Sequence, residues 1–194
     1  MKITGPVMLE FIKKSKTTFQ FSDKKIQDRD LNMILEAARW SPSFQNCQPW
    51  SFVVIDEKKL IEKVMSSCFY GNFHTSPKKI IAIVLEPISK SMPGLLKGKF
   101  AEIIDSHKYM TIAMPVLNLV YEAESLGIGS CILSPHSDNI TKLLSIPQKK
   151  EVPLAIGLGY EKKESFKRER VRNALKDIVF YNRYGQKWTA TKTP

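Results

Sequence analysis

Residues 41–55 carry the side chains best suited to chemistry in this chain. Two carboxamides, Asn46 and Gln48, lie between Pro42-Ser43 and Pro49. A carboxamide offers both N–H donors and a C=O acceptor. The pair can therefore form hydrogen bonds with a planar heterocycle whose edge alternates C=O and N–H groups. The alternative interpretation is a capped turn, in which Asn46 and Gln48 only satisfy nearby backbone groups.

The elements that must position this segment are visible in the hydrophobic periodicity. We predict an amphipathic helix over residues 30–40, because apolar residues recur at the spacing of one helix face, namely Leu31, Ile34, Leu35 and Ala38. Asp28 or Asp30 is available as its N-cap, and Pro42 ends it. Residues 52–55 form a short apolar run that predicts a strand.

The rest of the chain alternates helices and strands without repeats, which predicts a single domain over residues 1–194. Helices are expected over 8–14 and 57–68, a buried strand over 79–85, and a Pro- and Gly-rich loop over 86–100 as a candidate lid. The stretch 101–126 is helical and apolar around most of its circumference, so it must be enclosed, and a subunit interface would enclose it. Pro115 should kink or split this helix.

Composition excludes several classes of protein. The three cysteines are scattered without a C-x-x-C pair, which indicates reduced thiols and a cytoplasmic location. No apolar run approaches the ~20 residues of a membrane span, so no membrane association is expected. The three histidines, His74, His107 and His136, show no triad or metal spacing, and we expect no metal.

The formal charge of +11 arises from 30 Lys and Arg against 19 Asp and Glu. Lysines are spread along most of the chain, and the densest basic segment, residues 162–172, is interrupted by Glu164 and Glu169. Solvated surface charge and an anion-binding role for part of this segment are both compatible with the pattern. Nucleic acid is disfavoured as a partner, because no zinc-finger spacing and no aromatic-rich basic strand is present.

The spacing of Ser41-Pro42-Ser43, Asn46 and Gln48-Pro49-Trp50 resembles the signature motif of the FMN-dependent nitroreductase family. Weaker likenesses elsewhere extend the resemblance over roughly residues 9–184. The resemblance implies an α+β fold, with a central, mainly antiparallel sheet flanked by helices and a long buried helix at the core of a homodimer. It also implies one FMN per interface site, bound in part by Pro42, Ser43, Asn46 and Gln48.

Three further segments match the family's flavin contacts. Residues 13–19 are similar to a basic-x-Ser-x-basic-x-Phe motif, which implies contacts from Lys13, Lys14, Ser15 and Thr17. Thr17 stands where the family usually has Lys or Arg, near N1 and O2 of the isoalloxazine. Residues 130–133 are expected as a strand after the helix that ends at Gly127 and Gly129. Residues 131–135 match the family's loop that lies over the flavin and offers a backbone N–H to its N5, which implies Cys131, Ile132, Leu133 and Ser134; the alternative is a helix C-cap followed by an ordinary core strand. Arg170 and Arg172 match a basic pair that binds the phosphate.

The reaction implied by the resemblance is ping-pong hydride transfer. NAD(P)H reduces the flavin at N5 and leaves, and a small-molecule acceptor such as a nitroaromatic or a quinone is then reduced. No side chain acts as nucleophile or general base, because the cofactor carries the chemistry. The Gly-x-Gly segments at Gly127 and Gly157 lack a Rossmann context, so no dedicated nicotinamide site is expected. The alternative is a flavin-holding or flavin-sensing protein with little turnover, which the Thr17 departure favours.

Overall fold

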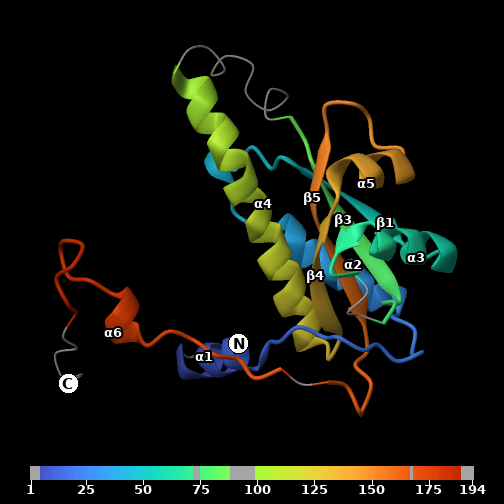
Figure 1. Cartoon of the computed structure of the whole chain (residues 1–194), viewed down its shortest axis with the longest axis horizontal. Coiled ribbons are helices and arrows are strands. Elements are labelled where there is room, and N and C mark those ends of the chain that lie inside the picture. The colour runs from blue at the N-terminus through green and yellow to red at the C-terminus, as the bar shows by residue number, and fades with distance from the viewer. Residues whose placement is uncertain (1–4, 72–74, 88–98, 167, 189–194) are drawn as a thin grey trace.

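The computed structural model describes residues 5–71, 75–87, 99–166 and 168–188 (Figure 1). Most of the predicted candidate lid, residues 88–98, and His74 lie outside the described residues. The described chain forms an α+β domain in which helices cover both faces of one sheet (Figure 1). This architecture confirms the predicted fold class.

The sheet has five strands in the order β1-β3-β5-β4-β2. The strands are β1 (Trp50–Ile55), β2 (Cys68–Phe69), β3 (Lys79–Leu85), β4 (Gly129–Pro135) and β5 (Glu151–Gly159). Every neighbouring pair is antiparallel. The bounds of β3 are those predicted from its β-branched run, because a strand that is buried on both faces reads as a continuous apolar segment.

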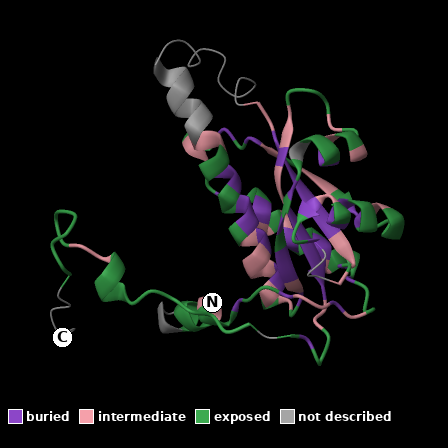
Figure 2. Cartoon of the chain, viewed as in Figure 1, coloured by how far each residue is buried: buried purple, intermediate pink, exposed green. Residues whose placement is uncertain are grey.

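The helices divide between the two faces of the sheet. They are α1 (Gly5–Lys14), α2 (Asp28–Arg39), the 3₁₀ turn η1 (Phe44–Asn46), α3 (Lys58–Ser66), α4 (Lys99–Ser125), α5 (Ser137–Leu143) and α6 (Leu175–Ile178). Helices α2 and α4 pack with Ile81 and Ile83 of β3 into one core, while α3 and α5 share a second core with Ile80 and Ala82. Buried residues accordingly concentrate on the sheet and on the face of α4 turned toward it (Figure 2).

Several predicted boundaries are wrong by a few residues. Helix α2 begins at Asp28 and its N-cap is Gln27, so Asp28 and Asp30 lie in the first turn instead, where their charge favours the helix dipole. Helix α3 ends at Ser66, and Cys68 belongs to β2, which pairs with Pro135. Pairing with β4 across the sheet overrides the helical periodicity at this point.

Helix α4 is continuous from Lys99 to Ser125, so the predicted split at Pro115 does not occur. A proline ring removes one backbone hydrogen bond, and packing of α4 on α2 and on the sheet holds the rest of the ladder. None of the described helices is long and apolar enough to cross a membrane.

The two faces of α4 differ in burial. Ile112, Val116, Leu119 and Ala123 are buried in the core shared with α2. Met110, Met114 and Leu117 lie on the opposite face and are about half exposed, between 44% and 53%. One chain therefore leaves a row of large apolar side chains uncovered along its longest helix, as the all-round apolar pattern predicted.

Residues 168–188 form a C-terminal arm that leaves the domain beside α1 (Figure 1). The arm contains α6 and a bridge between Phe180 and Lys187. It extends on the side of α4 that faces away from the sheet (Figure 1), and most of its residues are exposed (Figure 2). Its root is tied to α1, because Arg170 donates a hydrogen bond to the carbonyl oxygen of Lys13.

Candidate functional site

A cavity of about 910 Å³ lies between the segment after α1, the C-terminal half of α4, β4 and the root of the arm. Its lining includes the predicted contacts Ser15, Thr17, Ile132, Arg170 and Arg172. Leu117, Val120, Tyr121 and Phe166 add apolar surface. The volume falls within the range of small-molecule sites, about 300–1,000 Å³. Three motifs that are distant in sequence thus meet at one cavity.

The segment after α1 is held against β4. Thr17 and Ser130 form an isolated parallel β-bridge, and the backbone N–H of Thr18 donates a hydrogen bond of 2.8 Å to the carbonyl oxygen of Ser130. This pairing leaves the Thr17 side chain exposed at the cavity, while Ser15 is buried in its wall. Lys16 also lines the cavity, and its ammonium lies 2.7 Å from Glu161.

Lys13 and Lys14 lie on the last turn of α1, outside the lining of the cavity. Lys13 pairs with Glu10 at 2.8 Å, and both lysines are exposed. They directly precede Ser15 in sequence, at the end of α1. The structure therefore brings Ser15 and Thr17 into the cavity and leaves the two lysines at its edge.

Residues 130–133, predicted as a strand, and the segment matched to the family's loop over the flavin both belong to β4, whose residues alternate between two environments. The side chains of Cys131 and Leu133 are buried in the core, and burial raises the pKa of the Cys131 thiol to about 12. Ile132 is 53% exposed at the cavity, and Ser134 is exposed farther along the strand. Cys131 and Leu133 can therefore contact a ligand only through their backbone.

One backbone N–H group on the free edge of β4, that of Ile132, has no hydrogen-bond acceptor among the described residues. Since the Ser130 carbonyl accepts from Thr18, alternation in the ladder turns the backbone N–H and C=O of Ile132 and Ser134 toward the same edge. Strand β2 covers Ser134 by pairing it with Phe69. The edge-facing N–H of Ile132 makes no hydrogen bond within the described part of the chain, so it is available to an acceptor in the cavity.

The two arginines at the cavity make different contacts. Arg170 donates from Nη1 to the Lys13 carbonyl at 2.5 Å, which satisfies an end group of α1. Arg172 donates to the carbonyl of its neighbour Val171 at 2.8 Å, and no acidic side chain among the described residues pairs with it. Among the described residues, the Arg172 guanidinium therefore makes no hydrogen bond or ion pair outside the arm.

The amide turn, residues 41–48, is strained and internally bonded. Gln45, Asn46 and Gln48 have positive φ values of 46°, 56° and 45°. Ser43 Oγ accepts from the backbone N–H of Gln48 at 3.0 Å, and Gln48 Nε2 donates to Asn46 Oδ1 at 3.2 Å. Both amides are exposed, and such strain in non-glycine residues is typical of functional sites.

The amide turn does not line the cavity, and neither do Pro42 and Ser43 within it. Phe44 packs on His107 with ring centroids 4.9 Å apart, near the N-terminal end of α4, whereas the cavity contains Leu117 and Tyr121. At the rise of an α-helix, His107 and Tyr121 are about 21 Å apart along the axis. In one chain, Phe44 of the amide turn and the cavity therefore lie at different heights along α4.

Sequence reasoning missed the role of α4 in both halves. Leu117, Val120 and Tyr121 line the cavity. Asn118 donates from Nδ2 to the Ala37 carbonyl at 3.1 Å and to Ser41 Oγ at 2.8 Å, which ties the amide turn to the helix. A single polar residue within an apolar helix was the signal that could have identified Asn118.

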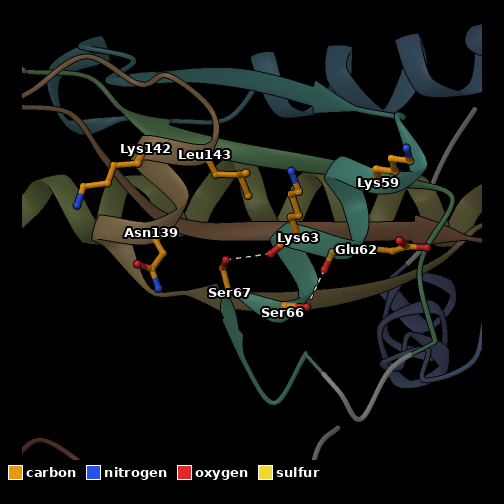
Figure 3. Close-up of a pocket in the computed structure, with 8 residues that line it drawn as sticks. All are labelled: Lys59, Glu62, Lys63, Ser66, Ser67, Asn139, Lys142 and Leu143. Atoms are coloured by element: carbon orange, nitrogen blue, oxygen red, sulfur yellow. Dashed lines mark hydrogen bonds between the residues drawn. The ribbon is translucent and has the colours of Figure 1, made fainter.

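A second hollow, of about 760 Å³, lies between α3 and α5 (Figure 3). Lys59, Lys63 and Lys142 line it, but Lys142 points away from the other two (Figure 3). The hydroxyls of Ser66 and Ser67 donate to carbonyls within α3. This hollow therefore lacks the convergent polar groups of a ligand site. Within the described ranges, no His, Cys, Asp and Glu side chains group in a way that could hold a metal ion.

The model of the nitroreductase family matches residues 12–160 of this chain. This match covers most of the chain, and it includes the amide turn, the segment after α1 and β4. The chain belongs to the nitroreductase family. The family membership supports an oxidoreductase activity.

Individual relatives agree with this placement. A protein of Archaeoglobus fulgidus, provisionally named NADH dehydrogenase/NAD(P)H nitroreductase, is 28% identical over 149 residues, which are 74% of this chain and 79% of the relative. The iodotyrosine deiodinase of Thermotoga neapolitana is 26% identical over 191 residues, or 92% of this chain and 99% of the relative.

Solved structures show the same fold. A protein of Desulfovibrio desulfuricans, provisionally called a nitroreductase and solved in complex with FMN, superposes with a TM-score of 0.74 at 20% identity. The match covers 94% of this chain and 99% of that one. The nitroreductase fold predicted from the motifs is thereby confirmed.

We predict that Asn118→Ala lowers the free energy of unfolding by about 1–3 kcal/mol, because the buried Ser41 hydroxyl loses its donor. Asn118→Asp should cost at least as much at pH 7, since a carboxylate cannot donate to the Ala37 carbonyl. The matched control is Asn139→Ala, which changes an exposed asparagine and should stay within about 0.5 kcal/mol. Urea unfolding at fixed protein concentration measures all three. Equal values for Asn118→Ala and Asn139→Ala would contradict the tie between turn and helix.

Proposed function

We propose that this protein is a homodimeric, FMN-dependent oxidoreductase that uses NAD(P)H to reduce a small-molecule acceptor such as a nitroaromatic or a quinone. The observation that carries the proposal is the cavity at which Ser15, Thr17, Ile132 and Arg172 meet. These residues come from three separate motifs, and the family match covers two of them. The FMN found with the Desulfovibrio relative supports the same cofactor here.

The residues of the cavity suit FMN. Arg172 offers a guanidinium fork that matches phosphate oxygens, and the charges of Lys13 and Lys14 lie nearby on α1. The edge-facing N–H of Ile132 suits a ring nitrogen or carbonyl acceptor. Leu117 and Tyr121 supply apolar surface for a flat ring system. FMN would supply the chemistry, by taking two electrons as hydride from NAD(P)H and passing them to the acceptor.

The chain's own residues would bind and orient. Arg172 would hold the phosphate, and Arg170 would keep α1 and Ser15 in place through the Lys13 carbonyl. The backbone of Ile132 would set the height of the ring above β4. No described side chain at the cavity is required as a nucleophile or a general base.

The site is complete only between two chains. The amide turn does not line the cavity of its own chain, its Phe44 packs on α4 about four turns before the cavity residue Tyr121, and the uncovered face of α4 between them is apolar. A two-fold axis near Met114 would cover Met110, Met114 and Leu117 and would bring the amide turn of one chain to the cavity of its partner. Asn46 and Gln48 could then read the ring edge of an FMN whose phosphate the other chain holds.

A flavin-holding or flavin-sensing protein with little turnover remains the second candidate. The observation that favours it is Thr17, which leaves the cavity without a lysine or arginine at that position. Steady-state turnover with NADH and with NADPH separates the two functions. The acceptor panel should hold a quinone, a nitroaromatic and iodotyrosine, because relatives bear nitroreductase and deiodinase names.

We predict that each chain binds about one FMN non-covalently. Arg172 should contact the phosphate, whereas Arg170 should act only by holding α1 in place. Arg172→Ala should weaken FMN about 10- to 100-fold and leave riboflavin unchanged, because riboflavin has no phosphate. Arg170→Ala should weaken both ligands alike, since it acts through α1. Flavin fluorescence titration measures each affinity, with Lys163→Ala as an exposed control outside the cavity. A protein that binds no FMN would sink the proposed cofactor, and parallel losses for Arg172→Ala would remove its phosphate role.

Mixed dimers test the shared site. We predict that Asn46→Ala/Gln48→Ala chains and Arg172→Ala chains both bind FMN weakly as homodimers. A heterodimer of the two has one site with every group intact and one site with both defects. Isolated through two different affinity tags, it should therefore bind one FMN with wild-type affinity. If both halves of the site came from the same chain, the heterodimer would have two weak sites and no tight one.

We predict that Thr17→Lys raises the flavin midpoint potential by roughly 20–80 mV. A cation at this edge stabilises the charge that develops on reduction by on the order of 1–4 kcal/mol, and for two electrons about 1.4 kcal/mol corresponds to 30 mV. Thr17→Gln is the neutral control and should leave the potential unchanged. A dye-equilibrated reductive titration measures it. An unchanged potential in Thr17→Lys would leave Lys16 as the cation near the ring, and Lys16→Gln should then lower the midpoint potential. If neither variant changes the potential, this segment does not face the ring.

A further inference from the structure

The cavity has one basic residue that does not come from the arm, and an acid holds it. Lys16 lines the cavity, whereas the other basic lining residues belong to the root of the arm, namely Arg168, Arg170 and Arg172. The Lys16 ammonium lies 2.7 Å from the carboxylate of Glu161, a residue that is not part of the cavity lining. The ion pair therefore offers the cavity its cation and not its acid.

Both partners of this ion pair stand on backbone that the sheet fixes. Lys16 directly precedes Thr17, which forms its bridge with Ser130 of β4. Glu161 follows β5 and forms an antiparallel bridge with Phe21. The two side chains are only partly exposed, 39% for Lys16 and 28% for Glu161. Since a lysine side chain on its own samples many rotamers, an acid at contact distance determines where its ammonium lies.

Glu124 and Arg170 are two further charged side chains near the pair. Burial raises the pKa of the Glu124 carboxyl, and the positive charges of Lys16 and Arg170 oppose that rise. Arg170 is itself held at the Lys13 carbonyl. Within the described part of the chain, the acid in ion-pair contact with Lys16 is Glu161. Glu161 is therefore the group that fixes the lysine.

We propose that Glu161 is a positioning residue for the flavin of the proposed function. It holds the Lys16 ammonium at the cavity wall and offsets part of its charge, and the pair thereby sets the reduction potential of bound FMN. The inference rests on the proposed cofactor and extends it to a residue outside the cavity. Glu161 also lies one residue beyond the stretch that the family model matches, residues 12–160.

The electrostatic reason is the charge that the ring gains on reduction. A nearby cation stabilises that charge and a nearby anion destabilises it. Because Thr17 supplies no charge, Lys16 provides the cation on this side of the cavity, and Glu161 keeps the potential below the value that Lys16 alone would give. A lower potential makes the reduced flavin a stronger electron donor to the acceptor. Both charges are partly solvated, so each should shift the redox equilibrium by about tenfold rather than by several orders of magnitude.

Three variants of the full-length, FMN-loaded protein test the pair, with the midpoint potential measured by dye-equilibrated reductive titration. Glu161→Gln should raise the ratio of reduced to oxidised flavin at a fixed potential about tenfold, which is about 30 mV for a two-electron couple. Lys16→Gln should lower the same ratio about tenfold. The double variant should return close to the wild-type value, because the two charges that it removes have opposite signs.

Two controls separate this effect from a change in packing. Lys16→Arg keeps the charge and should keep the wild-type potential. Asp23→Asn breaks another ion pair, in which Lys78 lies 2.7 Å from Asp23 outside the cavity, and it should leave the potential unchanged. Circular dichroism and the FMN content show that each variant is folded and loaded.

The outcomes distinguish this role from the proposed cofactor. A potential that Glu161→Gln leaves unchanged or lowers would overturn the positioning role while FMN binding stands. A potential that does not respond to Lys16→Gln would overturn it as well, since Glu161 acts through that ammonium. A wild-type chain that binds no FMN would instead overturn the proposed cofactor, and the role of the pair with it.

Discussion

The two-sided burial of α4 is the constraint on which the rest of the molecule depends. One face of the helix, with Ile112, Val116 and Leu119, completes the core over the sheet. The opposite face is almost as apolar, and burial of such surface stabilises by about 25 cal/mol per Å². Phe44 of the amide turn packs on α4 near its N-terminal end, and the cavity lies beside the C-terminal half of the helix. Association and cofactor binding would therefore draw on the same surface, so each should strengthen the other.

Strand β4 is the second constraint, because alternation decides which of its groups a ligand can reach. Cys131 and Leu133 fill the core beside α3 and α5, and Ile132 necessarily faces outward between them. Thr18 and β2 cover the strand edge on either side of Ile132. The single open N–H is thus a consequence of where the neighbouring segments end. A ligand that accepts this bond extends the sheet in the way an additional strand would.

The sequence predicted the elements well and their mutual placement poorly. The bounds of β3 and the existence of α4 follow from local apolar patterns, which need no knowledge of the rest of the chain. The family motifs indicated Ser15, Thr17, Ile132, Arg170 and Arg172 of the cavity. They did not indicate that Lys13 and Lys14 would stay at its edge, that the amide turn would lie outside it, or that Arg170 would bind α1. The contact between Arg170 and Lys13 joins residues 157 positions apart, and no local pattern encodes it. The strand predicted over residues 130–133 is confirmed, and pairing with β5 and β2 extends it to Pro135, through the segment matched to the family's loop over the flavin.

The strain of the amide turn bears on how affinity and selectivity divide between the two halves of the site. Residues held at positive φ cost of order 1–3 kcal/mol each, and they persist where the surroundings determine the backbone. Here Asn118 holds Ser41, Ser43 holds Gln48, and Phe44 packs on His107. The turn is therefore already built before a ligand arrives. However, Gln48 gives up its bond to Asn46 when either amide turns to a ligand, so the net gain is a difference between two hydrogen bonds. The amides can then select the ring by its pattern of donors and acceptors, while the charged phosphate contact and the buried face of α4 would supply most of the affinity.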